Sequence, residues 1–239
     1  MGSSSNGSDG MSGVHRTLSG AMEIEYSVRR SQRARRVRVT VDPARGVEVV
    51  LPRRAAQREA AAAISELRPW IERRVAELER AQAAVAARGN TVPFLGESLR
   101  LIGQTGRVRV RRRGNELFAP AAADERTRAL ERWYRSAARQ EIVSRLDRAC
   151  ALAGTDYSGL TIRGQRTRWA SCSPTGAMSF NWRLMLAPAA VLDYVVWHEV
   201  CHLEVMDHSP RFWALLARRC PDYRKQARWL KRHGATLNL

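Results

Sequence analysis

Alternating apolar and polar residues mark the first strands of this 239-residue chain. Val37, Val39 and Val41 are separated by charged or polar residues, so in an extended strand the three valines share one face. Residues 42–46, Asp-Pro-Ala-Arg-Gly, have the composition of a turn, and 47–51 is again apolar. The pattern therefore predicts a β-hairpin.

Two long segments rich in Ala, Glu, Arg and Leu predict helices at 55–87 and 124–153. Pro69 is expected to break the first of them, and Trp70 and Ile71 to pack back onto the sheet. Between the helices, glycines separate short apolar runs, which predict strands at 92–95, 99–102, 108–112 and 116–118.

A second hairpin is predicted at 160–186, with strands at 160–162, 166–171 and 178–186 and a turn at 173–176. Prolines then mark the starts of three helices, near 188, 210 and 221, and Ser209 is typical of an N-cap. The sequence shows no internal repeat. The whole pattern indicates an α+β fold, in which antiparallel strands and helices come first and a hairpin with a further set of helices follows.

The composition is that of a globular protein, with 44% hydrophobic residues. No apolar run approaches the roughly 18 residues of a membrane helix, and the first residues do not resemble a secretory signal. We therefore expect a cytoplasmic protein that does not enter a membrane. Cys150, Cys172, Cys201 and Cys220 form no C-x-x-C pair and are interpreted as reduced thiols.

The net charge of +18 comes almost wholly from arginine. Such a field attracts polyanions, and guanidinium groups bind phosphate or carboxylate in a bidentate manner. Nine arginines lie between Arg29 and Arg54. They could bind phosphates of a nucleic acid, or they could form the solvated outer face of the first hairpin. A codon preference for arginine would also explain the composition.

The most informative motif is His198-Glu199-Val200-Cys201-His202. Histidines four residues apart share one face of a helix, and neutral imidazoles are good Zn²⁺ ligands. A catalytic zinc site needs a third protein ligand. Since no Glu occurs after Glu204, His208 is the economical choice, while Asp207, Asp222 and His233 are alternatives.

Glu199 follows the first ligand directly and lies about 100° around the helix from it, beside the metal face. It is the expected general base, which takes a proton from zinc-bound water and passes it to the leaving amine. Tyr194, Tyr223 and Arg168 are candidates for stabilising the oxyanion. The metzincin motif has the same histidine spacing but has Gly where this chain has Val205.

The block from 166 to 213 resembles the YgjP-like metallopeptidase domain, a family related to the SprT-like and WLM zinc peptidases. The resemblance is carried by segments that include Arg166–Ser173, Asn181–Leu184, Asp193–Leu203 and His208–Trp213, and it extends over roughly 24–236. It implies that His198, His202 and His208 bind zinc and that Glu199 is the catalytic acid/base.

Two positions depart from the pattern of that family. Ala170 stands where Gly is usual, and Asp207 stands where Asn is usual. Asp207 could accept a hydrogen bond from the second nitrogen of a ligand histidine. Trp169, Trp182, Trp197 and Trp213 are expected to pack in the core rather than to form a cleft wall, and strand 178–186 could offer its edge to an extended peptide.

The chain is predicted to consist of three parts: a disordered tail at 1–20, a strand-rich part with a long helix at 21–120, and a zincin-like metallopeptidase part at 121–239. Residues 21–239 could also form one domain. The expected function is zinc-dependent hydrolysis of peptide bonds in a protein or peptide substrate. A nucleic-acid-associated protein and a non-catalytic metal-binding module are the alternatives.

Overall fold

The computed structural model describes residues 14–17, 23–42, 45–106, 109–165 and 168–239. The chain forms two compact units, Met1–Arg80 and Ala81–Leu239, called unit 1 and unit 2 below. The boundary lies within a helix, well before the predicted boundary near 120. It lies there because the strands between 91 and 120 bury their apolar residues in the core of unit 2.

Unit 1 is built on a four-stranded sheet of order β1-β2-β4-β3, formed by β1 (Val14–Thr17), β2 (Ile24–Ser31), β3 (Arg38–Asp42) and β4 (Gly46–Pro52). The predicted hairpin is confirmed as the antiparallel pair β3–β4, and β2 runs parallel to β4. Four residues of the predicted tail instead form β1, because they pair with the first residues of β2. The rest of that tail lies outside the described residues.

Helix α1 (Arg58–Ala86) contains Pro69 without interruption, so the expected break at this proline is wrong. Proline leaves the carbonyl four residues earlier without its helical donor, and that residue, Ser65, is exposed, so water can take the place of the donor. Ile64 and Ile71 are fully buried against the sheet. Trp70 is exposed, contrary to expectation.

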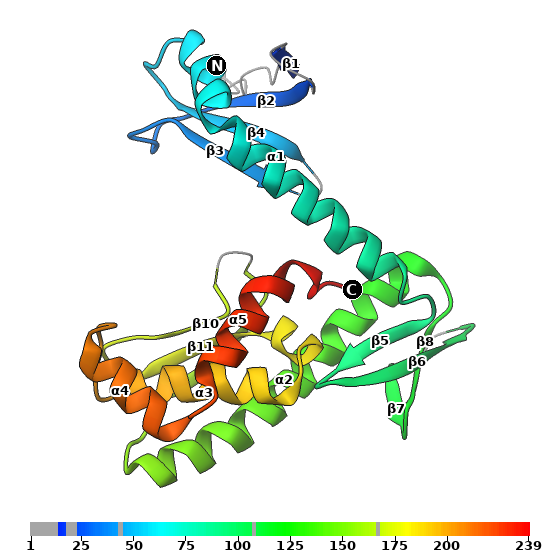
Figure 1. Cartoon of the computed structure of the whole chain (residues 1–239). Helices are drawn as coiled ribbons and strands as arrows, with labels where there is room; N and C mark the ends of the chain where they lie inside the picture. The colour runs from blue at the N-terminus through cyan, green and yellow to red at the C-terminus, as the bar shows by residue number, and fades with distance from the viewer. Residues whose placement is uncertain (1–13, 18–22, 43–44, 107–108, 166–167) are drawn as a thin grey trace, which may run out of the picture. The chain divides into compact units, whose positions relative to one another are not determined.

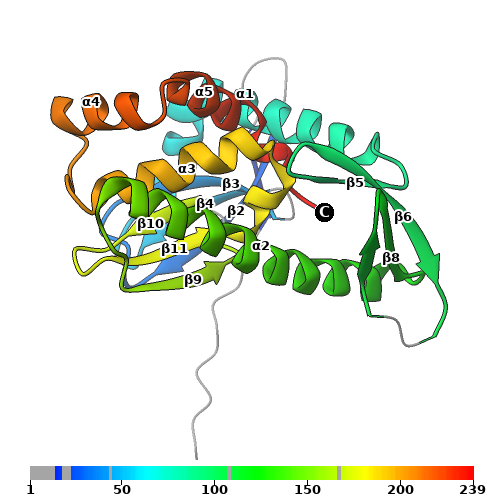
Figure 2. The same ribbon diagram turned by 90° about the horizontal axis from the view of Figure 1, so that it is seen from below.

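Unit 2 contains a second four-stranded sheet of order β5-β6-β8-β7, formed by β5 (Thr91–Phe94), β6 (Glu97–Gln104), β7 (Arg111–Arg113) and β8 (Glu116–Pro120). The four strands correspond to the predicted short strands. The first residue of the predicted strand 108–112 lies outside the described residues. Helix α2 (Ala123–Ala153) follows, close to its predicted bounds. It runs from this sheet along unit 2 and lies beside the helix α3 (Ala189–His202) (Figures 1 and 2).

The two four-stranded sheets share one topology. In each, the first two strands are antiparallel, the second and fourth are parallel, the third and fourth are antiparallel, and a long helix follows. The structure therefore contains an internal repeat that the sequence did not reveal, since the two segments share a pattern of pairing rather than matching residues.

A three-stranded sheet of order β10-β11-β9 completes the strands of unit 2, formed by β9 (Gly159–Arg163), β10 (Ala170–Cys172) and β11 (Ala177–Asn181). The predicted hairpin is present as β10–β11, although residues 166–167 lie outside the described part. The predicted strand 178–186 ends at Asn181, and Trp182–Leu186 form the 3₁₀ helix η1. The Asn181 side chain caps η1 by accepting a hydrogen bond from the Arg183 amide.

Four helical elements end the chain: α3 (Ala189–His202), α4 (Pro210–Arg219), α5 (Tyr223–His233) and the short η2 (Gly234–Thr236). The first three begin at or just after the predicted prolines. Fully buried residues of α2, η1 and α3 share one large core with β5, β6, β8 and β11. None of the helices in the described part of the chain combines the length and apolar character needed to span a bilayer.

Candidate metal centre

The position of α3 is fixed at its first residue by contacts from the second sheet. The Ala189 amide donates to the Leu95 carbonyl at 3.2 Å, and the Leu95 amide donates to the Met185 carbonyl at 2.8 Å. Leu95 has a positive φ of 51°, which is uncommon for a residue with a side chain. The turn between β5 and β6 thus ties the end of η1 to the start of α3.

The apolar residues of α3 bury the helix on several sides, with Val195, Val196 and Val200 almost fully enclosed. This burial holds the last turn of the helix, where His198, Glu199 and His202 stand. Glu199 and His202 are buried and His198 is half-buried. Helical geometry then places the two imidazoles on the same face.

After α3 the chain reverses within 203–209 and brings back His208. The Val205 side chain is buried, and its amide donates to the Cys201 carbonyl at 3.0 Å. Val205 has no positive φ, so this turn does not require glycine. Ala170 has no positive φ either, so its backbone conformation does not require glycine.

The three histidines converge as predicted. The His198 Nε2 atom lies 3.3 Å from His202 Nε2 and 3.0 Å from His208 Nε2. Ligand atoms of all three lie within 4.8 Å of one another, and no other group of three such side chains was found among the described residues. Asp207, Asp222 and His233 do not join the cluster. His233 stacks near Trp229 instead, with ring centroids 4.8 Å apart.

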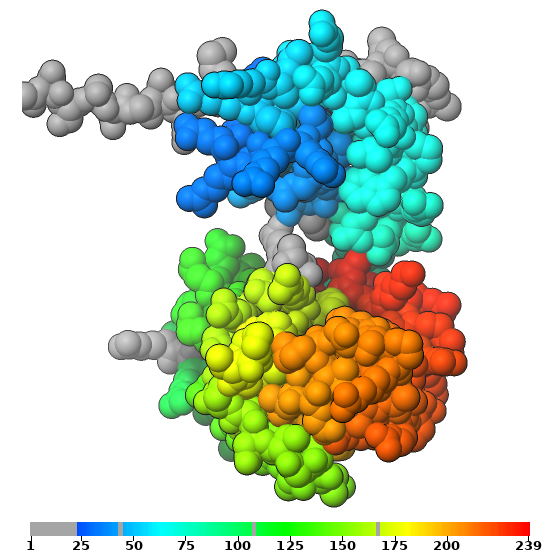
Figure 3. Space-filling model, turned by 90° about the vertical axis from the view of Figure 1, so that its left-hand side faces the viewer, coloured from blue at the N-terminus to red at the C-terminus, as the bar shows by residue number. Residues whose placement is uncertain are grey.

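Phe212, in the first turn of α4, contacts all three imidazoles. Its ring centroid lies 4.9 Å from that of His198, 4.5 Å from that of His202 and 4.9 Å from that of His208. The side chain is fully buried. This contact was not predicted, although Phe212 lies four residues after His208 at the start of a helix. Figure 3 shows α4, in orange, at the surface of unit 2 beside the β10–β11 hairpin.

Hydrogen bonding fixes the ring of His202. Its Nδ1 lies 3.1 Å from the Val205 carbonyl oxygen. A carbonyl only accepts, so Nδ1 must carry the proton and Nε2 presents its lone pair to the cluster. Asp207 does not play the predicted part of second partner to a histidine. Its carboxylate accepts a hydrogen bond from the Ser209 amide at 3.3 Å and so holds the start of α4.

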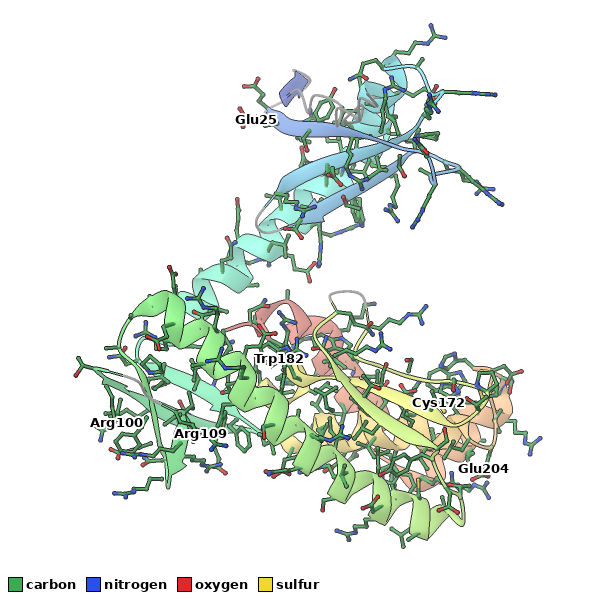
Figure 4. The ribbon with its side chains drawn as sticks, turned by 180° about the vertical axis from the view of Figure 1, so that it is seen from behind. Glu25, Arg100, Arg109, Cys172, Trp182 and Glu204 are labelled. Carbon is green, nitrogen blue, oxygen red and sulfur yellow. The ribbon has the colours of Figure 1, made fainter. Side chains whose placement is uncertain are left out.

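Burial lowers the pKa of His198 and of His202 and raises that of Glu199. Burial, followed by repulsion from His202 and His208, lowers the pKa of His198 to about 3. Burial raises the pKa of Glu199 to about 7, and a hydrogen bond from the Cys172 backbone opposes that rise. Cys172 belongs to β10, so this strand and α3 meet at Glu199. Figure 4 shows Cys172 and Glu204 toward the same end of unit 2.

A family model described as "YgjP-like, metallopeptidase domain" matches residues 35–233. The chain belongs to the YgjP-like metallopeptidase domain family. Among solved structures, a match was found to the metallopeptidase zymogen abylysin of Pyrococcus abyssi, with 19% identity and a TM-score of 0.33. That match covers 38% of this chain and 92% of the other. No curated protein matches the chain.

Membership of the YgjP-like family implies a peptidase that uses a divalent metal, and the histidine cluster fits such an ion. Burial lowers the pKa of His198 and that of His202, whose proton is held on Nδ1. Together with the imidazole of His208 they are a suitable donor set. The His198 Nε2 atom faces His202 and His208, while its Nδ1 is buried without a protein partner among the described residues.

Of the three oxyanion candidates, two tyrosines lie beside the cluster. The ring centroid of Tyr194 lies 6.0 Å from that of His198. Burial raises the pKa of Tyr194, and the charge of Glu199 raises it further. Tyr223 stacks on Trp213, and its hydroxyl accepts a hydrogen bond from Arg224 at 3.1 Å. Arg168 is exposed, and no side-chain contact places it at the cluster.

The four tryptophans differ in their surroundings. Trp182 is a core residue, as expected, and Trp169 and Trp197 are half-buried. Trp213 is exposed and stacks on His208 with ring centroids 5.6 Å apart, so it borders the site. The expectation that strand 178–186 offers its edge is wrong, because β11 is the central strand and pairs on both sides.

Proposed function

We propose that this chain is a zinc-dependent peptidase in which His198, His202 and His208 hold the metal and Glu199 is the general base. The observation that carries the proposal is the meeting of three imidazoles beside a buried carboxyl group. Bound zinc supplies Lewis acidity, which lowers the pKa of water and polarises a carbonyl group. Three protein ligands leave a coordination position open for that chemistry.

Glu199 is suited to proton transfer because of its burial. A carboxyl group whose pKa is near 7 exists in both protonation states at neutral pH. It can therefore take a proton from the attacking water and return it to the leaving amine. The Cys172 backbone orients the carboxylate for this exchange. A non-catalytic metal-binding module would have no use for a buried acid at this position.

The free side of β10 is the proposed place of the substrate. On either side of β10, the Trp169 carbonyl accepts a hydrogen bond from the Asn181 amide, and the Ser173 amide donates to the Ala177 carbonyl. Backbone groups alternate in direction along a strand, so those of Ala170 and Cys172 face away from β11. The Cys172 amide meets Glu199, and the groups of Ala170 remain for an extended peptide. Such a peptide would pass the base as an added strand.

The experiment that tests this function compares the wild-type chain with Glu199→Gln on a library of denatured-proteome peptides. We expect wild type to cleave peptides and Glu199→Gln to cleave them about 10²–10⁴-fold more slowly, because the base is lost. Both proteins should hold the same amount of zinc. Equal cleavage by the two would remove Glu199 as base, and a zinc-loaded wild type that cleaves no peptide would contradict the proposed reaction.

A further inference from the structure

One end of the sheet in unit 1 concentrates positive charge. β2 and β4 are parallel and end together, at Ser31 and Pro52, and β3 begins opposite them because it is antiparallel to β4. The loop between β2 and β3 and the segment after β4 therefore meet at this end. Together with the first residue of β3 they carry six exposed arginines, which we call the arginine end: Arg33, Arg35, Arg36, Arg38, Arg53 and Arg54.

The side chain of Arg30 stabilises the backbone of the arginine end through hydrogen bonds. Its Nη1 donates to the carbonyl of Arg53 at 2.8 Å and to that of Ala55 at 2.9 Å. These bonds tie the end of β2 to the segment after β4. The backbone that presents the arginines is thus held by hydrogen bonds as well as by the sheet.

The charge of the arginine end is not neutralised by neighbouring acids. Within the part of the chain that the structure describes, none of the six arginines has a carboxylate partner. The acidic residues of the first strands lie elsewhere: Glu25 near the start of β2, Asp42 at the far end of β3 and Glu48 beside Arg29. Figure 4 shows nitrogen-tipped side chains spreading from the end of β2 opposite to Glu25.

The arginine end also lacks apolar anchors. The large hydrophobic side chains that the described residues expose are Leu67, Trp70, Leu152, Met206 and Trp213, and none of these lies between 29 and 54. Protein interfaces depend on buried aromatic and aliphatic residues at their centre, and binding to single-stranded nucleic acid depends on aromatic side chains that stack on bases. Contacts to the phosphate backbone of a duplex require only charge and hydrogen bonds.

From this placement we infer that the arginine end of unit 1 binds the phosphate backbone of a nucleic-acid duplex without sequence preference. Guanidinium groups pair with phosphate oxygens in a bidentate manner, and six of them on three adjacent segments present a broad cationic surface. The inference is independent of the proposed peptidase reaction, since none of these arginines belongs to the metal centre.

The test measures binding of the full chain to a fluorescent 20-base-pair DNA duplex by anisotropy at several salt concentrations. Four phosphate contacts predict about a hundredfold loss of affinity between 50 and 200 mM salt. The Arg35→Gln, Arg36→Gln, Arg53→Gln, Arg54→Gln variant should bind about tenfold more weakly or worse at 100 mM salt. All four side chains are exposed, so the fold should persist, as circular dichroism can verify.

The matched control removes the same charge elsewhere, with Arg73→Gln, Arg128→Gln, Arg132→Gln and Arg148→Gln, all exposed residues of α1 and α2. It should change duplex affinity less than about twofold. Glu199→Gln should bind the duplex like wild type.

Four outcomes would overturn the inference. The two quadruple variants could lose equal affinity for the duplex, or the affinity of wild type could show little dependence on salt. A single strand could bind more tightly than the duplex. Poly-glutamate of equal charge could displace the labelled duplex as well as unlabelled DNA does.

Discussion

The two four-stranded sheets have the same order and the same directions of their strands, yet they serve the molecule differently. Helix α1, of 29 residues, buries Ala60, Ile64 and Ile71 on the first sheet alone. Helix α2, of 31 residues, covers the second sheet and also contacts β9, η1 and α3. One copy of the topology belongs to unit 1 and carries the arginine end, and the other supports the helix that carries His198 and His202, two of the proposed metal ligands.

The link between the second sheet and the site is made by backbone hydrogen bonds rather than by topology. Leu95, in the turn between β5 and β6, bonds both to η1 and to the start of α3. The Tyr134 hydroxyl on α2 donates to the Pro93 carbonyl at 2.6 Å, which joins the same sheet to the long helix. Two copies of one topology therefore differ in role through the few residues that connect each of them to its neighbours.

The largest effect is expected from matched substitutions in the two cores. Leu117→Ala in β8 and Leu51→Ala in β4 each remove a fully buried leucine and should each cost about 2–5 kcal/mol of stability. Only Leu117→Ala should lower the temperature at which the chain releases its metal, as followed with a zinc-sensitive dye during heating. Equal lowering by both variants would contradict the separate roles of the sheets.

A smaller effect is expected at Phe212. Replacement by Leu removes the ring that contacts three imidazoles while it keeps an apolar side chain in α4, so zinc affinity should fall about 10-fold through looser ligand orientation. Competition with a chelator of known affinity measures this. Leu216→Val, one turn further along the same helix, is the control and should leave affinity unchanged. An unchanged zinc affinity in Phe212→Leu would show that the ring fills space in the core without orienting the histidines.

The Tyr134 hydroxyl gives the next effect. Phe at this position removes a buried hydrogen bond and should cost about 1 kcal/mol at pH 7. Burial raises the pKa of Tyr134 above that of an unfolded tyrosine, about 10. Its neutral form therefore stabilises unit 2 fully below pH 10, and this contribution falls as the pH rises further.

Urea unfolding between pH 8 and 11 checks this pH dependence. The wild-type midpoint should decline more steeply above pH 10 than that of Tyr134→Phe. Parallel curves for the two proteins would mean that Tyr134 ionises equally easily in the folded and unfolded chain.

The smallest effect is expected from two ion pairs that occupy similar places in the repeated sheets. Arg29 on β2 pairs with Glu48 on β4 at 3.2 Å, and Arg100 on β6 pairs with Glu116 on β8. Both arginines are exposed, so Arg29→Gln and Arg100→Gln should each change stability by less than about 1 kcal/mol. Urea unfolding of the two variants measures this. A loss of several kcal/mol in one variant would show that its sheet depends on charge.

Much of the candidate site could be predicted from the sequence because its three histidines are close along the chain. Spacing of four on a helix fixes two histidines, and the short turn before Ser209 leaves little room for His208 to lie elsewhere. Glu199 could be predicted as the candidate general base because it directly follows His198 on the same helix, without knowledge of any long-range contact. Cys172 and Phe212 were missed as neighbours of the site because tertiary packing, not local pattern, brings them there.

The fold was predicted where periodicity was strong and missed where context decides. Helices 124–153 and 210–219 and the first hairpin agree with the structure. Residues 182–186 look like a continuation of β11, but Asn181 caps a 3₁₀ turn there. Pro69 is accommodated because its face of α1 is exposed, and the repeated sheet topology leaves no trace in residue identity.

The central claim is that His208 completes a three-histidine metal site. Its most direct test is the zinc content of purified protein by mass spectrometry, for wild type, His208→Ala and the control His233→Ala. We expect about one zinc per chain in wild type and His233→Ala and far less in His208→Ala, because two imidazoles alone bind zinc weakly. About one zinc per chain in His208→Ala would contradict the assignment.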